Sequence, residues 1–175
     1  MLDQIIIKQG DITAEDVDAI VNAANPSLLG GGGVDGAIHR AAGPELLKEC
    51  KTQGGCKHGE ARITKGYNLK AKHIIHTPGP IYKNGKMGEK EILINSYYNS
   101  LKLAKENNLE SIAFPAISTG VYSYPLEEAC HTAITTTINF MDKEDYLLNV
   151  IFVLFDNSNY SLYNKYLEKL KNELS

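Results

Sequence analysis

The sequence has no long apolar run, and this shortage excludes an integral membrane protein of the helical kind. The longest apolar stretch, Val150–Phe155, is far too short to cross a bilayer. The first residues, Met1-Leu2-Asp3-Gln4, lack the basic and long apolar segments of a signal peptide. The sequence therefore predicts a cytoplasmic protein that does not bind membranes.

Cysteine is also scarce, with Cys50, Cys56 and Cys130 alone in the chain. An odd and sparse set does not make a disulfide framework, so a reducing compartment is the simpler interpretation. Cys50, Cys56 and His58 lie close in sequence, but their spacing fits no common zinc site and no fourth ligand is evident. We therefore expect no metal and no cofactor, and cysteines that serve in packing.

Neither sign of charge is in large excess, since 21 acidic residues face 18 basic ones. The formal net charge of −3 and the pI of about 6.0 disfavour bulk nucleic-acid binding, although not a pocket for one nucleotide. The chain has 175 residues, of which 43% are hydrophobic and 22% charged. These values exclude disorder, collagen and coiled coil as its main character and predict one globular domain with its own core.

Short apolar runs alternate with amphipathic segments along the chain. The runs that predict strands are 5–8, 19–23, 61–64, 73–77, 111–114 and 149–155. Helices are expected over 35–42, 45–51 and 126–140, around the stripe that contains Leu93 and Ala104, and over the stripe from Tyr163 to Leu174, with Ser158 as the N-cap of the last helix. This alternation predicts an α/β domain with a parallel or mixed sheet, in which ligands bind at the carboxyl ends of the strands.

The most unusual segment contains four consecutive glycines, Gly30–Gly33, between a predicted strand and a predicted helix. Backbone N–H groups in such a loop, with a helix N-terminus behind them, can bind an anion. The alternative is a flexible surface loop. The P-loop lysine is missing, and the match of Gly31, Gly33 and Gly36 to the dinucleotide fingerprint is weak. Asp35 ends the loop, and a carboxylate repels phosphate, which suggests a role other than phosphate binding.

Three further segments follow predicted strands. Ser118-Thr119-Gly120 offers hydroxyls and a close backbone, although alone it predicts only a turn. Asp11 can act as a turn or N-cap residue, and Asn25, before a proline, as a turn former. Both side chains can also bind a ligand, because carboxylates and amides hydrogen-bond to bases and sugars.

Taken together, Gly10-Asp11-Ile12-Thr13, Asn22-Ala23-Ala24-Asn25, Gly30–His39 and Ile117–Tyr122 occur in an order and at spacings that resemble the macrodomain family. Cys56-x-x-Gly59-Glu60-Ala61 and His76-Thr77-x-Gly79-Pro80 are also similar to its MacroD-type branch, which hydrolyses ADP-ribosyl esters. The resemblance runs from about Ile5 to about Leu167. It implies a single macrodomain over residues 1–175, a three-layer α/β/α fold with a central mixed sheet, and an ADP-ribose cleft at the strand ends.

The resemblance also implies roles for individual residues. Asp11 would accept a hydrogen bond from the adenine amino group, with Ile12 nearby, and Phe155 would stack on the adenine. Asn25 would hold the distal ribose, and Asp35 would lie near the scissile bond and orient or activate the attacking water; these two are the catalytic residues that the resemblance implies. The diphosphate and distal ribose would be wrapped by two loops: Gly30, Gly31, Gly32, Gly33 and Val34; and Ser118, Thr119, Gly120, Val121 and Tyr122.

Two functions from different classes follow. The first is an enzyme that hydrolyses O-acetyl-ADP-ribose or mono-ADP-ribosyl-Asp/Glu on proteins, with ADP-ribose and ADP-ribosylated proteins as its ligands. The second is a non-catalytic module that binds ADP-ribose. Asp35 and Asn25 favour the enzyme, since a binding module has no need of an acid that repels the diphosphate. A nicotinamide-dependent oxidoreductase is a third, weaker possibility, which a null NAD titration would remove.

Overall fold

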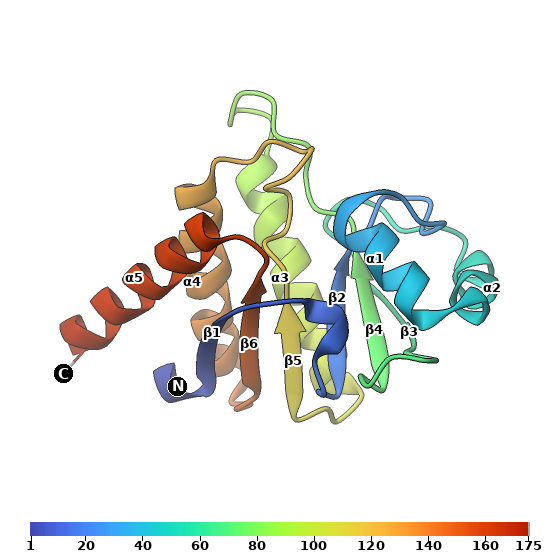
Figure 1. Cartoon of the computed structure of the whole chain (residues 1–175). Helices are drawn as coiled ribbons and strands as arrows, with labels where there is room; N and C mark the ends of the chain where they lie inside the picture. Colours follow the sequence, from blue (N-terminus) through green and yellow to red (C-terminus); the bar gives the residue numbers. More distant parts are fainter. Residues whose placement is uncertain (175) are drawn as a thin grey trace.

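The computed structural model describes residues 1–174 and has a six-stranded sheet at its centre (Figure 1). The strand order is β1-β6-β5-β2-β4-β3, and all neighbouring strands are parallel except β3 and β4, which are antiparallel. The strands are β1 (Ile5–Gln9), β2 (Ala19–Ala23), β3 (Arg62–Lys65), β4 (His73–Thr77), β5 (Ser111–Phe114) and β6 (Asn149–Leu154). The expectation of a mixed sheet is confirmed.

Helices cover both faces of this sheet. Helices α1 and α2 pack on one face, where they touch β2 and β3, whereas α3, α4 and α5 pack together on the other. The helices are α1 (Gly33–Ala42), α2 (Pro44–Thr52), α3 (Glu89–Glu106), α4 (Leu126–Glu144) and α5 (Asn157–Leu174), with short 3₁₀ turns η1 (Leu2–Gln4) and η2 (Ile12–Ala14). The expected three-layer α/β/α fold is therefore confirmed.

Each helical layer has its own apolar core against the sheet. The larger core lies under α3–α5 and contains Tyr97, Phe114 and Phe152, whose rings contact one another. The smaller core lies under α1 and α2 and contains Ile38, Leu46 and Ile74. A strand covered on both faces reads as a continuous apolar run, and this explains why β2 and β5 were visible in the sequence.

Two buried strands carry a polar residue where an apolar one would pack. Asn22 on β2 and His76 on β4 are register partners on adjacent parallel strands, and both are fully buried. Buried polar side chains need hydrogen-bond partners. These two side chains meet each other, with Asn22 Nδ2 3.1 Å from His76 Nδ1.

Helix starts differ from the sequence predictions at α1, α2 and α5, and α2 begins one residue early, at Pro44. Ser158 as N-cap of the last helix is wrong, because α5 begins at Asn157 and the Asp156 carboxylate accepts from the Asn159 N–H at 2.8 Å. Helix α1 begins at Gly33, two residues before the predicted start. Asp35 is therefore the third residue of α1 rather than the first.

Two features bear on the cysteines and on membranes. All three cysteines are free and buried, as expected, and burial raises the pKa of Cys50 and Cys56 to about 11 and that of Cys130 to about 12. Such thiols remain protonated and unreactive at neutral pH. Within residues 1–174, none of the helices combines the length and apolar composition that a bilayer crossing requires.

Candidate ligand cleft and buried carboxylate

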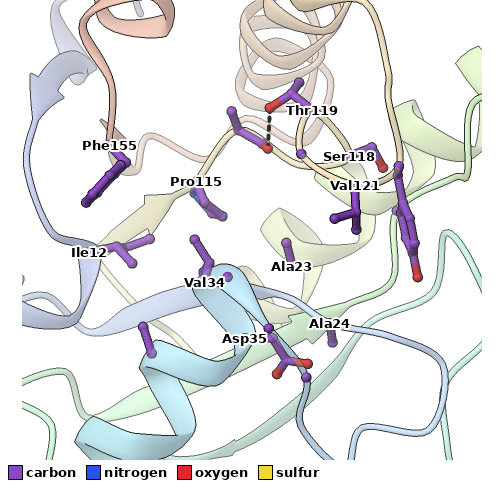
Figure 2. Close-up of a pocket in the computed structure, with 18 of the residues that line it drawn as sticks. Ile12, Ala23, Ala24, Val34, Asp35, Pro115, Ser118, Thr119, Val121 and Phe155 are labelled. Atoms are coloured by element: carbon purple, nitrogen blue, oxygen red, sulfur yellow. Dashed lines mark hydrogen bonds between the residues drawn. The ribbon is translucent and has the colours of Figure 1, made fainter.

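A cleft of about 710 Å³ opens at the edge of the sheet where the five parallel strands end. Its volume is that of a site for a nucleotide-sized ligand. Its walls come from the segments that follow β1, β2, β5 and β6, with Gly79 after β4. All of the predicted site residues line this cleft except Gly30, so tertiary structure brings together segments that are far apart in the chain (Figure 2).

The glycine-rich loop forms one wall and runs directly into α1. Gly32 is the N-cap residue of this helix, so the unpaired N–H groups of its first turn lie at the cleft. A Cβ on Gly36 would lie 2.5 Å from the Gly31 carbonyl oxygen, so only glycine lets the loop fold back onto the helix. The loop and helix together offer the free N–H groups that an anion site needs.

Asn25 organises this loop from within. Its Nδ2 donates to the Gly30 carbonyl at 2.7 Å, and its Oδ1 accepts from the backbone N–H and hydroxyl of Ser27. The Gly30 carbonyl thus faces Asn25, and Gly30 does not line the cleft. Asn25 itself does, and a Cβ on Gly31 would lie 3.3 Å from its Nδ2.

Asp35 is a buried carboxylate in the cleft wall, with only 5% of its surface exposed. Its Oδ1 accepts from Asn22 Nδ2 at 2.9 Å and lies 3.5 Å from His39 Nε2. Burial raises the pKa of Asp35, and the Asn22 hydrogen bond and the charge of His39 only partly oppose that effect. Its Oδ2 faces the glycine loop, since a Cβ on Gly31 would lie 3.0 Å from it.

Asp35 is not the N-cap of α1. The residue is the third of α1, and the N-cap position belongs to Gly32, with no side-chain cap. A buried acid that caps nothing and carries a raised pKa is typical of a functional site.

Behind Asp35 stand polar residues that the sequence analysis missed as functional candidates. Asn22 Nδ2 also contacts His76 Nδ1 at 3.1 Å, and His76 Nε2 contacts Thr64 Oγ1 at 2.9 Å. The available signal was a polar residue inside an apolar strand, at Asn22 in β2 and at His76 in β4. A polar side chain at such a buried position needs a hydrogen-bond partner inside the protein.

The second loop, after β5, forms the opposite wall. Ser118 has a left-handed backbone (φ +67°), and a Cβ on Gly79 would collide with its hydroxyl and with Ile117. The buried Tyr97 hydroxyl on α3 accepts from the Ile117 N–H at 3.2 Å and so supports the loop from below. Thr119 closes a turn through its hydroxyl, which donates to the Ala116 carbonyl at 3.0 Å.

Ile12 and Phe155 lie at one end of the cleft, with Asp35, Ser118 and Val121 toward the other (Figure 2), and Asp11, next to Ile12 in the chain, also lines the cleft. The Phe155 ring is 85% exposed and available for stacking. Asp11 Oδ1 caps η2 by accepting from the Thr13 N–H and hydroxyl at 2.9 and 2.7 Å. The turn role that the sequence allowed is therefore present, and Oδ2 makes no hydrogen bond to residues 1–174.

Asp156 and Asn159 also line the cleft and were not predicted from the sequence. Asn159 is buried, and its Oδ1 has no hydrogen-bond partner in the described chain. Their sequence signal was hidden because Asp-Asn-Ser-Asn is equally typical of an ordinary helix start. Across residues 1–174, no three His, Cys, Asp or Glu side chains are grouped so as to hold a metal ion.

Comparison with known proteins agrees with this geometry. Residues 21–133 match the Macro domain family, which covers the glycine loop, Asp35 and the second loop. The chain belongs to the macrodomain family. This macrodomain is 50% identical to the O-acetyl-ADP-ribose deacetylase of Escherichia fergusonii over 99% of this chain and 100% of that protein.

Two solved macrodomains have the same fold. The Oceanobacillus iheyensis macrodomain with ADP superimposes with a TM-score of 0.90 at 48% identity, over 95% of this chain and 91% of that one. The Trypanosoma brucei macrodomain in complex with ADP-ribose has a TM-score of 0.88 at 45% identity, over 94% of this chain and 69% of that one. The resemblance noted in the sequence is confirmed at the level of family and fold.

Proposed function

We propose that this macrodomain binds ADP-ribose in the cleft and hydrolyses ADP-ribosyl esters to release it. The substrates are O-acetyl-ADP-ribose and mono-ADP-ribosyl-Asp/Glu on proteins. The observation that carries the proposal is Asp35, a buried carboxylate whose Oδ2 faces the glycine loop at the end of the cleft away from Phe155. The deacetylase relative and the ADP-ribose complex of another macrodomain support it.

Ligand orientation follows from the two ends of the cleft. Adenine lies on Phe155 with its amino group toward Asp11 Oδ2, and the diphosphate lies between the glycine loop and the loop from Ser118 to Tyr122. The distal ribose then reaches Asn25 and Asp35. This order uses the backbone N–H groups for charge and the side chains for specificity.

The chemistry is attack of water on the ester. Asp35 accepts the hydrogen bond that orients this water, and its raised pKa moves the carboxylate toward the range in which a general base is effective. The water oxygen adds, the ester bond breaks, and the products are ADP-ribose and a carboxylic acid. Fixed backbone dipoles of the two loops stabilise developing negative charge without reorganisation.

The alternative is a module that binds ADP-ribose without chemistry. The direct test is incubation of the purified protein with O-acetyl-ADP-ribose and, separately, with a protein carrying ADP-ribosyl-Asp/Glu, with released ADP-ribose measured by mass spectrometry. If the protein is a hydrolase, ADP-ribose should be released from at least one of the two substrates above the no-enzyme control. Tight ADP-ribose binding with no release from either substrate would establish the binding module instead.

A further inference from the structure

A chain of buried hydrogen bonds runs from Asp35 across the sheet, away from the cleft. It passes from Asp35 on α1 to Asn22 on β2, His76 on β4 and Thr64 on β3, with distances of 2.9, 3.1 and 2.9 Å. Asn22 and His76 are fully buried, and Thr64 is 2% exposed. These groups lie outside the cleft wall, so ligand contact does not account for them.

Counting donors fixes the direction of every bond. The Asn22 amino group can only donate, and its two protons go to Asp35 Oδ1 and to His76 Nδ1. His76 Nδ1 must therefore be unprotonated, so the ring proton lies on Nε2 and is donated to Thr64 Oγ1. The Thr64 hydroxyl in turn donates to the Lys65 carbonyl at 3.2 Å.

We propose that His76 is a positioning residue for Asp35: its unprotonated Nδ1 holds the Asn22 amide in the orientation that places a donor on Asp35 Oδ1. The free Oδ2 is thereby left for the cleft. The inference rests on the proposed role of Asp35. A proton on His76 Nδ1 would have the opposite effect, because it would turn the amide oxygen of Asn22 toward Asp35 and remove that donor.

This orientation of the Asn22 amide uses the amino group and not the oxygen. Asn22 Oδ1 is buried and has no hydrogen-bond partner among residues 1–174. The orientation is instead the one in which both amino protons are used, one of them on the carboxylate.

The other titratable groups near the chain leave His76 neutral. Burial, followed by the charge of His39 on α1, lowers the pKa of His76 to about 3. The Cys50 thiol on α2 lies 4.0 Å from His76 Nε2, and burial raises its pKa to about 11. A neutral ring with its proton on Nε2 is thus maintained over the physiological range.

The first test needs no enzyme activity. In the ¹⁵N-labelled full-length protein, long-range proton–nitrogen NMR should show His76 as the neutral Nε2–H tautomer from pH 5 to pH 8. An Nδ1–H tautomer, or a ring that becomes charged in this range, would overturn the proposal. This outcome is independent of whether the protein hydrolyses esters.

The second test uses variants that leave the ring in place. Thr64→Val removes the acceptor for Nε2–H, whereas Thr64→Ser keeps it. Thr64→Val should lower kcat roughly ten-fold to a hundred-fold with little change in KM, because the reacting group is misplaced while the ligand contacts remain. Thr64→Ser should restore kcat to near the wild-type value. A pKa of Asp35, followed by ¹³C NMR, should be higher in the valine variant than in the serine variant.

The control is Thr137→Val, which removes another buried threonine hydroxyl, one that donates to the Ala133 carbonyl within α4 at 2.8 Å. It should lose stability with normal kcat. If Thr64→Val keeps normal kcat and an unchanged Asp35 pKa, the proposal is wrong. If the wild-type protein hydrolyses no ester, the proposed function fails, and the tautomer and the Asp35 titration still decide the role of His76.

Discussion

At the scale of single residues, two of the side chains that line the cleft also hold local structure. Asp11 caps η2 with Oδ1, and Asn25 fastens the glycine loop with both ends of its amide. Replacement by alanine would mix the two tasks. At Asp11 an isosteric substitution separates them, because the capping bonds use Oδ1 alone.

Asp11→Asn should reverse the base preference of the cleft. Asparagine is as good an N-cap as aspartate, so η2 is kept, but the atom toward the base becomes a donor. ADP-ribose should lose at least about ten-fold in affinity, as expected for a hydrogen bond to a charged group of roughly 1.5–3 kcal/mol. The hypoxanthine analogue should gain relative to ADP-ribose. Calorimetry with both ligands measures this, and an unchanged preference would remove Asp11 from the adenine site.

Asp35→Asn should abolish hydrolysis but not binding. Loss of a general base costs roughly 10²–10⁴ in rate. Affinity for ADP-ribose should hold or rise, because a charge that repels the diphosphate is removed. Single-turnover hydrolysis and calorimetry on one sample give the two values. Normal turnover would show that another group activates the water.

The same variant should also change how thermal stability depends on pH. The pKa of Asp35 is raised in the folded protein above its ordinary value of 3.8. The folded state is therefore penalised as pH rises through the folded-state pKa, and the penalty is absent at pH below 3.8. Asp35→Asn removes it, so the Tm of the variant relative to wild type should increase from pH 4 to pH 7. A decreasing difference would contradict the assigned shift.

Gly120→Glu should abolish ADP-ribose binding and leave the fold intact. A Cβ on Gly120 meets no atom within 4 Å, so the side chain is accommodated in the free protein. In the complex it would occupy the space of the diphosphate and add repulsion. Unchanged Tm with lost binding is the expected pair of results. Normal binding would show that the second loop does not contact the ligand.

At the scale of elements, the buried Glu89 binds the backbone of the segment that connects β4 to α3. The Glu89 carboxylate accepts from the backbone N–H groups of residues 83, 84, 85 and 87 at 2.6–3.1 Å. Burial opposes its ionisation, but these donors outweigh it and lower the pKa of Glu89 to about 2. The connection is tied to the cleft, since the Tyr82 N–H donates to the Tyr122 carbonyl at 2.9 Å.

Glu89→Gln should loosen this connection without unfolding the sheet. One carboxylate oxygen becomes a donor that faces backbone donors, so at least one N–H loses its acceptor. Trypsin should then cut after Lys83 and Lys86 faster than in wild type, as followed by mass spectrometry. Glu91→Gln, an exposed change on the same helix, is the control. Equal cleavage rates in the two variants would show that Glu89 does not order the segment.

At the scale of the whole molecule, the first and last strands lie side by side. Ile5 on β1 pairs with Val150 on β6, so the two ends of the chain share one sheet. Both core clusters contain residues from distant parts of the sequence. Unfolding of one part should therefore expose the rest.

We accordingly predict that residues 1–175 unfold as one domain. Thermal unfolding followed by far-ultraviolet circular dichroism and by tyrosine signals should give one coincident transition. ADP-ribose at about 100 times its Kd should stabilise the whole domain by about 2.7 kcal/mol. Two separate transitions, or stabilisation of only one signal, would contradict a single cooperative unit.

The amino-acid sequence by itself determined the local elements and much of the candidate site. Apolar runs predicted all six strands, most clearly β2, β4 and β5, because strands buried on both faces leave that pattern. The glycine run predicted the anion loop, and the chemistry of a carboxylate beside it singled out Asp35. These features depend on residues close together in the chain, where propensity and pattern are informative.

Only the tertiary structure decided which distant residues meet. His76 lies 54 residues after Asn22, and the two are neighbours because β4, and not β3, pairs with β2. The close approach of Gly79 to Ser118 was settled in the same way. Strand order and close contacts between loops arise from packing of the whole chain, since parallel neighbours are joined by long crossovers that leave no local signature of their pairing.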